Sequence, residues 1–189
     1  LEDLRSPRQV TSQPVSAPQP LTEHHRLGDF DSGVPSLDDW LKRRAARNQT
    51  NGSSRTYVVC EGAAGAKEQA KEQARVIAYY CLAAGAIGHA QAPSTMKRNR
   101  PDPIPVLVLG RLAVHRDHHQ KGMGTALLND AIRRALQAAQ IAGVTALLVH
   151  AISESARRFY LSRGFIESPV EPMTLCLMLA TVDRALRET

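Results

Sequence analysis

The chain has 189 residues, of which 43% are hydrophobic, so it is long enough for one domain with a substantial buried core. Its 24 lysine and arginine residues outnumber 18 acidic residues, giving a net charge of +6 that is compatible with a nucleic-acid partner but does not establish one. No apolar run approaches the ~20 residues of a membrane span, so we expect no membrane anchor or signal peptide and a cytoplasmic protein.

The three cysteines, Cys60, Cys81 and Cys176, each lie in an apolar stretch, and none has a partner at metal-ligand spacing. Buried free thiols in a reducing compartment are the simplest interpretation. We therefore expect no metal site.

The N-terminal region divides at residue 20. Residues 1–20 are rich in proline, glutamine and serine and lack hydrophobic periodicity, which predicts an extended or disordered tail before a single domain at 21–189. Leu21–Phe30 is expected to enter the first strand. Ser36 is expected to cap a helix, whose apolar positions are Leu37, Trp40, Leu41 and Ala45.

Two apolar runs, Arg55–Cys60 and Arg75–Ala86, predict the strands of a hairpin. The segment between them holds a tandem Ala-Lys-Glu-Gln repeat at 66–73, which we interpret as a solvated helical turn inserted in the hairpin loop, and we assign it no function. A long connection at 88–105 follows, and it carries a basic cluster, Lys97, Arg98 and Arg100.

An apolar run at 106–114 is followed by a polar, basic loop at 115–121 and then by an amphipathic pattern. The run is rich in β-branched residues and leucine and follows Pro105, which predicts a buried central strand. Leucine and alanine recur at helical spacing after the loop. This spacing predicts a core-facing helix that begins near Gly122 or Met123.

Gly122 and Gly124, at this predicted helix start, lack the Cβ atoms that would block close backbone approach. The free N–H groups of a first helical turn and the positive end of the helix dipole favour a phosphate there. Leu127 occupies the third glycine position of a dinucleotide fingerprint, and the P-loop Lys-Ser/Thr pair is absent, so neither NAD nor ATP is favoured. A merely structural glycine turn is the alternative at this point.

The apolar stretch at 145–150 predicts a strand, and Ser153 is placed to cap the helix that follows. That helix carries Phe159 and Tyr160 and ends at Gly164. Another strand at 173–179 and a terminal amphipathic turn complete the chain. The order of strands, helix, strand, helix and strand predicts an α/β arrangement on a mixed sheet.

Two of these segments resemble motifs of the GNAT family of N-acetyltransferases. The run His119-Gln120-Lys121-Gly122-Met123-Gly124 is similar to the pyrophosphate loop of the family, with His119 in place of the usual Arg or Gln. The run Phe159-Tyr160-Leu161-Ser162-Arg163-Gly164-Phe165 is similar to the later motif of the family. The resemblance implies the GNAT fold, an α/β fold with a mixed central sheet whose parallel strands splay apart between flanking helices.

The resemblance also implies that acetyl-CoA is the cosubstrate. In such a fold the pantetheine arm pairs with the strand backbone, and the remaining contacts come from the loop and the second helix. The implied cofactor-binding residues are Leu112, Ala113, Val114, His119, Gln120, Lys121, Gly122, Met123, Gly124, Thr125, Ser155 and Phe159.

An amine that attacks acetyl-CoA passes through a tetrahedral oxyanion and expels a thiolate, so the site needs a hydrogen-bond donor and a general acid. We expect the N–H of Val114 to be the donor and Tyr160 to be the acid; the alternative for Tyr160 is a core aromatic whose hydroxyl faces water. His118 receives no role, and His150 is expected to be a packing residue. No general base is assigned, since an α-amine with a pKa of about 7.7 to 8.0 is partly neutral at working pH.

Within the family, residues 21–179 are similar to the GNAT toxins of bacterial type II toxin–antitoxin modules, which acetylate the amino group of aminoacyl-tRNA and block translation. The distinctive runs are Phe30–Leu41, Arg47–Gln49, Ser54–Val59, Pro101–Pro105 and Leu109–Val114. This resemblance implies a homodimer and a ribbon-helix-helix antitoxin. Two basic sets are expected to hold tRNA: Lys42, Arg43, Arg44 and Arg47, and Lys97, Arg98 and Arg100.

Two other functions stay open at this stage. A GNAT enzyme could act on a protein N-terminus or a small amine, and a small cationic amine would call for an acidic groove. A non-enzymatic module could keep the fold for CoA binding alone, but such a module would be expected to lose Tyr160, which is present.

Overall fold

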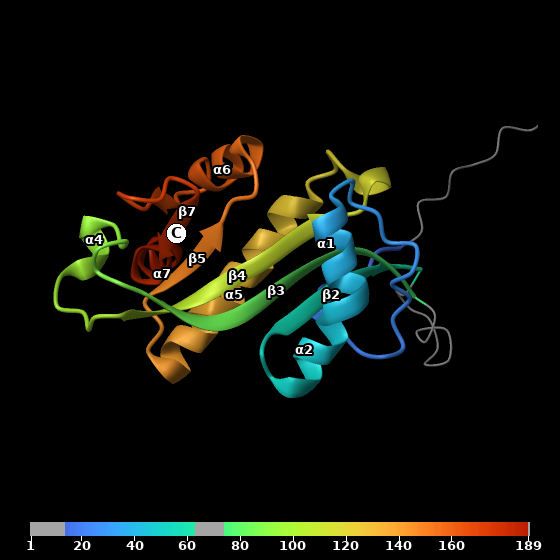
Figure 1. Cartoon of the computed structure of the whole chain (residues 1–189), viewed down its shortest axis with the longest axis horizontal. Coiled ribbons are helices and arrows are strands. Elements are labelled where there is room, and N and C mark those ends of the chain that lie inside the picture. Colours follow the sequence, from blue (N-terminus) through green and yellow to red (C-terminus); the bar gives the residue numbers. More distant parts are fainter. Residues whose placement is uncertain (1–13, 63–73, 189) are drawn as a thin grey trace, which may run out of the picture.

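The computed structural model describes residues 14–62 and 74–188, which form one seven-stranded mixed sheet with helices on both faces (Figure 1). The strands lie in the order β1-β2-β3-β4-β5-β7-β6. Among the described residues every neighbouring pair is antiparallel except β4 and β5, which are parallel. The strands are β1 Gln19–Pro20, β2 Arg55–Glu61, β3 Arg75–Ile87, β4 Ile104–Val114, β5 Ala146–His150, β6 Ile166–Glu167 and β7 Thr174–Met178. This confirms the predicted α/β fold.

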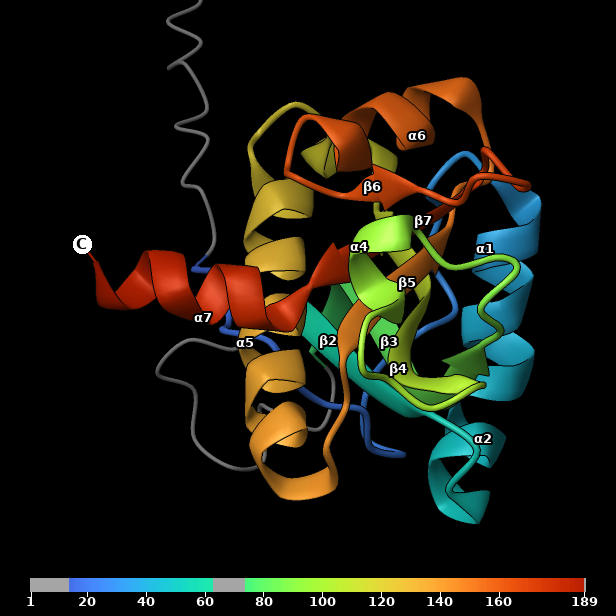
Figure 2. The ribbon, with the colours of Figure 1, turned by 90° about the vertical axis from the view of Figure 1, so that its left-hand side faces the viewer.

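Helices cover both faces of the sheet, as seen in Figure 2, which is turned by 90° from the view of Figure 1. The helical elements are α1 Pro35–Trp40, η1 Leu41–Ala45, α2 Ala46–Asn51, α4 Ser94–Lys97, η2 Arg116–His118, α5 Met123–Ala142, α6 Glu154–Leu161 and α7 Leu179–Arg187. The helices α5 and α7 lie on one face, and α1 and α2 lie on the other. Among the described residues no helix is long and apolar enough to cross a membrane.

The amphipathic pattern of α5 explains its place. Its buried residues Leu127, Leu128, Ala131 and Ala135 recur at helical spacing and pack on β3, β4 and β5. The opposite face of the sheet is covered at one end by Leu37, Leu41 and Ala45 of the α1 region and at the other by Ala92 and Met96 around α4. The core is therefore two-sided, with the sheet in the middle.

The prediction of a strand at Leu21–Phe30 was wrong, because strand pairing occurs earlier, where Gln19–Pro20 pairs with β2. Leu21 and Phe30 are buried at the two ends of a turn-containing segment, so they anchor a loop and do not follow the alternation of a strand. Residues 1–13 of the predicted tail lie outside the described residues, and the division at residue 20 stays a prediction.

The helix predicted after this segment begins two residues earlier than the predicted Ser36 cap implies. Val34 is the N-cap and Pro35 takes the first helical position, where its fixed φ and missing N–H are tolerated. Ser32 instead contacts this helix, since its N–H and hydroxyl both donate to the Asp38 carboxylate, at 2.9 and 2.7 Å. The repeat at 66–73 lies outside the described residues, so the helical turn predicted there is untested.

Candidate active site

A cleft opens where the parallel strands β4 and β5 separate. Their pairing runs from Val106 opposite Ala146 to Leu109 opposite Val149 and stops there, although β4 continues to Val114. Beyond this point no strand within residues 14–62 and 74–188 pairs with that edge of β4. The separation leaves unpaired backbone along β4, the arrangement that a splayed sheet requires.

A bulge in β4 accounts for the separation. Arg111 and Leu109 face the consecutive β3 residues Cys81 and Leu82, so Gly110 is an extra residue in β4. Such a bulge bends the strand and increases its twist. A Cβ atom at Gly110 would lie 3.2 Å from the Cys81 Sγ atom, which is a tight contact, so glycine lets β3 and β4 stay close at the bend.

The free edge of β4 presents backbone groups to the cleft. The N–H of His115 donates to the Ile77 oxygen at 2.8 Å, and backbone groups alternate sides along an antiparallel strand. Leu112 and Val114 therefore direct their N–H and C=O groups away from β3. The Val114 oxygen is contacted by the His119 Nε2 atom at 2.8 Å, so the His119 ring ties the following loop to the strand.

The loop that leads into α5 has the geometry of an anion site. Gln120 has a φ of 60° and Gly122 a φ of 77°, and left-handed residues in such a turn aim successive N–H groups at one point. The first helical hydrogen bond from this turn runs from the Ala126 N–H to the Gly122 oxygen at 3.1 Å. The N–H groups that precede Ala126 in the first turn are available for a phosphate.

The opposite wall is formed by the end of β5 and by α6. The Ser153 hydroxyl accepts from the Ala156 N–H at 3.1 Å, which confirms the predicted N-cap. Tyr160 is 8% exposed and packs against Phe159 and Phe165, with ring centroids 5.2 Å away in each case. Burial raises the pKa of Tyr160 to about 12, so the phenol stays protonated at physiological pH.

The cleft has a volume of about 610 Å³. Its lining residues are Leu37, Leu109, Gly110, Arg111, Leu112, Ala113, Val114, His118, His119, Gln120, Gly122, Met123, Gly124, Thr125, His150, Ala151, Ile152, Ser153, Ser155, Ala156, Phe159 and Tyr160. Arg111 is the one lysine or arginine among these described residues, and none of them is an aspartate or glutamate. The cleft therefore suits anionic ligands.

The histidines of the lining differ in their surroundings. The His118 Nε2 atom lies 3.7 Å from a carboxylate oxygen of Glu61, and burial lowers the pKa of His118. The His150 Nδ1 atom lies 2.9 Å from the hydroxyl of Thr174 across the β5–β7 pair, but His150 is exposed and lines the cleft, so it is not the packing residue that was predicted.

Comparison with known proteins identifies the family. The family described as "Acetyltransferase (GNAT) domain" matches residues 55–167, which is more than half of the chain. The chain belongs to the GNAT family of acetyltransferases. This confirms the resemblance indicated by the loop before α5 and by the sequence of α6.

Three similar proteins and structures refine the comparison. A tRNA-acetylating toxin of Mycobacterium tuberculosis (strain ATCC 25618 / H37Rv) is 43% identical over 164 residues, which make up 87% of this chain and 92% of the toxin. AtaT complexed with acetyl-methionyl-tRNAfMet is 26% identical with a TM-score of 0.80, over 92% of this chain and 99% of that one. A mutant of the AtaT toxin bound to the C-terminus of the antitoxin AtaR is 25% identical with a TM-score of 0.75, over 90% of this chain and 97% of that one.

Most of the cofactor residues that were predicted for this GNAT domain line the cleft. Lys121 is the exception, since it is exposed and its ammonium donates to the Asp117 oxygen at 2.8 Å. The predicted residues that line the cleft are Leu112, Ala113, Val114, His119, Gln120, Gly122, Met123, Gly124, Thr125, Ser155 and Phe159. Tyr160 lines it as well. Their contacts with acetyl-CoA stay a prediction.

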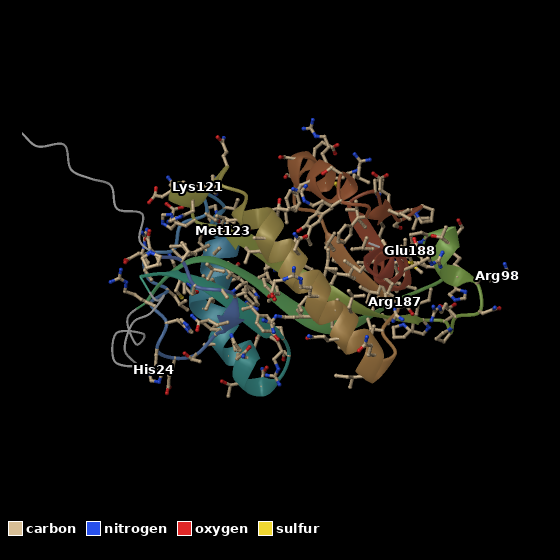
Figure 3. The ribbon with its side chains drawn as sticks, turned by 180° about the vertical axis from the view of Figure 1, so that it is seen from behind. His24, Arg98, Lys121, Met123, Arg187 and Glu188 are labelled. Carbon is tan, nitrogen blue, oxygen red and sulfur yellow. The ribbon has the colours of Figure 1, made fainter. Side chains whose placement is uncertain are left out.

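The basic residues that were predicted to hold tRNA do not line the cleft of the GNAT domain. Lys42, Arg43 and Arg44 lie in η1 and Arg47 in α2, all on the exposed surface. The second set lies at the end of α4 and just after it. Figure 3 shows its member Arg98 at the opposite end of the molecule from Lys121 and Met123, which mark the start of α5. The second set therefore lies far from the start of α5, and the role of both sets stays a prediction.

Arg163 does not line the cleft but contacts two residues that do, Thr125 and Phe159, and the sequence analysis missed it. Its Nη2 atom donates to the Thr125 hydroxyl at 2.6 Å, its Nη1 atom donates to the Phe159 oxygen at 2.9 Å, and its guanidinium carbon lies 3.8 Å from the centroid of the Phe159 ring. It thus joins the first turn of α5 to α6 beneath the cleft. The position before Gly164 carries no sequence signal for this contact, because its partners are distant in the chain.

Proposed function

We propose that this GNAT enzyme transfers an acetyl group from acetyl-CoA to the α-amino group of aminoacyl-tRNA. The observation that carries the proposal is the cleft itself, which combines an anion-binding loop, free strand backbone and a protonated Tyr160 and has no carboxylate among its described lining residues. The 43% identical relative named as a tRNA-acetylating toxin supports the acceptor, as does the likeness to AtaT complexed with acetyl-methionyl-tRNAfMet.

The chemistry follows from the two walls. The pyrophosphate of acetyl-CoA would lie on the free N–H groups at the start of α5, and the pantetheine arm would pair with the free edge of β4. The acceptor nitrogen then attacks the thioester carbonyl, and the oxyanion accepts a hydrogen bond from the Val114 N–H. When the carbon–sulfur bond breaks, the thiolate takes the proton of Tyr160, and water restores that proton afterwards.

The acceptor amine loses its proton to solvent. The α-amine of an aminoacyl ester is no more basic than a free α-amino group, with a pKa of about 7.7 to 8.0, so a neutral fraction exists at physiological pH without a dedicated base. A lysine side chain, with a pKa of ~10.4, would need one. The absence of carboxylates from the described lining also disfavours polyamines and other small cationic acceptors, which acidic groups would attract.

The wider assembly belongs to the same proposal. We propose that the protein acts in the bacterial cytoplasm as a homodimer, that a ribbon-helix-helix antitoxin neutralises it, and that translation stops when initiator or elongator aminoacyl-tRNA is acetylated. The likeness to AtaT bound to the C-terminus of the antitoxin AtaR supports a protein antitoxin. The basic sets Lys42, Arg43, Arg44 and Arg47, and Lys97, Arg98 and Arg100, would hold the tRNA backbone.

The test is incubation of the protein with acetyl-CoA and charged total tRNA, followed by mass spectrometry of the released aminoacyl adenosines. N-acetylated aminoacyl adenosine should appear with the parent protein. Acetylated peptides or polyamines in a parallel reaction, with no acetylated aminoacyl adenosine, would overturn the proposal. Binding of acetyl-CoA with no acetyl transfer to any acceptor would favour a binding module.

A further inference from the structure

Arg111 occupies an unusual position on β4. It follows the Gly110 bulge, its side chain is exposed, and it is the one lysine or arginine among the described residues that line the cleft. The strand around it is apolar, so a charged side chain here interrupts an otherwise hydrophobic run. The Nη1 atom donates to the Gly110 oxygen at 2.5 Å, which leaves most of the guanidinium donors unused within the described structure.

An aromatic column supports the guanidinium of Arg111. Its central carbon lies 5.8 Å from the centroid of the Trp40 ring in α1. The Trp40 ring stacks on Tyr79 with centroids 5.9 Å apart and planes at 7°. Tyr79 is fully buried, and its hydroxyl donates to the Leu37 oxygen at 2.8 Å, so the column is anchored in the core and to α1. The cation is thus partly ordered before any ligand arrives.

Among the described residues no ion pair joins a carboxylate to Arg111. Arg116, for comparison, is held by the Asp31 carboxylate at 2.7 Å. An unpaired, ordered guanidinium at a cleft is placed to meet an external anion. Along β4 it precedes Leu112 and Val114, whereas the pyrophosphate loop follows Val114, so Arg111 lies on the other side of the expected reaction centre from the phosphate site of the cofactor.

We propose that Arg111, supported by Trp40, binds the 3′-terminal nucleotide of the acceptor RNA. This inference rests on the proposed function. The aminoacyl group is esterified to the terminal ribose, so the terminal nucleotide must lie next to the cleft when the amine reaches the thioester. Unpaired RNA ends are held by bases that stack on aromatic rings or guanidinium planes, and the free guanidinium donors suit the adjoining phosphate. A peptide N-terminus or a simple amine offers neither group.

The first test compares Arg111→Gln and Arg111→Lys with the parent in steady-state acetylation of aminoacyl-tRNA. We expect the KM for aminoacyl-tRNA to rise about tenfold in Arg111→Gln and less in Arg111→Lys, because lysine keeps the charge and loses the planar surface. The kcat and the acetyl-CoA dissociation constant should stay within about twofold. The salt dependence of RNA binding should flatten by about one unit in slope, as expected for one lost phosphate contact.

The matched control is Arg133→Gln, which removes the same charge from an exposed position of α5. An aminoacyl amide that lacks RNA provides a second control, since its turnover should be equal in the parent and in Arg111→Gln. Equal losses with the amide and with tRNA would place Arg111 at the reacting groups and overturn the proposal. A matching fall in acetyl-CoA affinity would assign Arg111 to the cofactor and also overturn it.

Trp40 provides a readout that needs no substitution, because it is the only tryptophan in the chain. Its fluorescence should change in a saturable way with an RNA that has an intact 3′-terminal adenosine, and much less with the same RNA lacking that nucleotide. Unchanged emission at saturating RNA would contradict the proposal. If the parent acetylates no aminoacyl-tRNA, both proposals fail; if it does and Arg111→Gln matches it, only the inference on Arg111 fails.

Discussion

The β4 wall of the cleft presents backbone groups, whereas the α6 wall presents one phenol side chain. Leu112 and Val114 face the cleft through N–H and C=O groups whose direction is set by pairing with β3. Tyr160 faces it through a ring that Phe159 and Phe165 hold. The function of the β4 wall therefore depends on backbone geometry and should tolerate many different side chains. The function of the α6 wall depends on one atom, the hydroxyl oxygen of Tyr160. Substitutions should separate the two kinds of wall clearly.

The largest effect is expected at the α6 wall, from Tyr160→Phe. This change keeps the packing with Phe159 and Phe165 and removes only the hydroxyl, so turnover should fall on the order of 10²-fold while acetyl-CoA affinity stays nearly intact. Steady-state kinetics and calorimetry measure the two quantities. Tyr57→Phe is the matched control, since Tyr57 stacks on Tyr80 outside the cleft. Full turnover in Tyr160→Phe would move the general acid elsewhere.

The pH dependence of kcat/KM tests the role of Tyr160 in the α6 wall without any substitution. The acidic limb of kcat/KM should follow the acceptor α-amine, rising with pH up to about 8 as that amine becomes neutral. Burial raises the pKa of Tyr160 to about 12, so its protonated form persists and the decline expected near pH ~10 for a free phenol should be absent. The alkaline part of the profile is measured with an aminoacyl amide, because the ester of aminoacyl-tRNA hydrolyses at high pH. Activity on the amide that falls with a midpoint near pH ~10, in a protein still folded by circular dichroism, would contradict the role of a buried acid.

A smaller effect is expected at the start of α5, from Gly124→Val. A Cβ atom at Gly124 would meet the Phe159 ring at 3.9 Å, an ordinary contact, so the helix should stay folded while the added branches crowd the pyrophosphate. We expect acetyl-CoA affinity to fall about tenfold, equivalent to ~1.4 kcal/mol. Acetyl-pantetheine, which lacks the pyrophosphate, should bind the variant and the parent equally. A folded variant with unchanged acetyl-CoA affinity would remove the phosphate site from this turn.

The smallest effect is expected at the bulge of the β4 wall. Gly110→Ala places a Cβ atom 3.2 Å from the Cys81 Sγ atom, and we expect a loss of about 1 kcal/mol in unfolding free energy with a several-fold loss of activity. Cys81→Ala removes the crowding atom, so the double variant should recover much of both. Urea denaturation of the single and double variants measures the coupling. Strictly additive effects would mean that the sulfur does not set the geometry of the bulge.

Local patterns were sufficient for much of the fold and for part of the site. The hairpin of β2 and β3, the start of α5 near Gly122 and the Ser153 cap all depend on residues close in sequence, and each agrees with the structure. The strand prediction for residues 21–30 was wrong because the two apolar residues at the ends of this segment anchor a loop at the edge of the sheet. Whether this segment forms a strand or a loop depends on where it meets β2, which is distant in the sequence. The local pattern of residues 21–30 therefore cannot predict the outcome.

The sequence by itself determined the order of elements and the two motifs that meet at the cleft, because glycine positions, capping residues and apolar periodicity act over a few residues. The resemblance of those two motifs to known proteins indicated the family. Only the tertiary structure decided several side-chain contacts at and around the cleft. It placed Arg111 on the Trp40–Tyr79 column, joined Arg163 to Thr125, and turned Lys121 away from the lining. These relations depend on strand register, on the bulge at Gly110 and on packing between distant segments, and such contacts exist only once the sheet has formed.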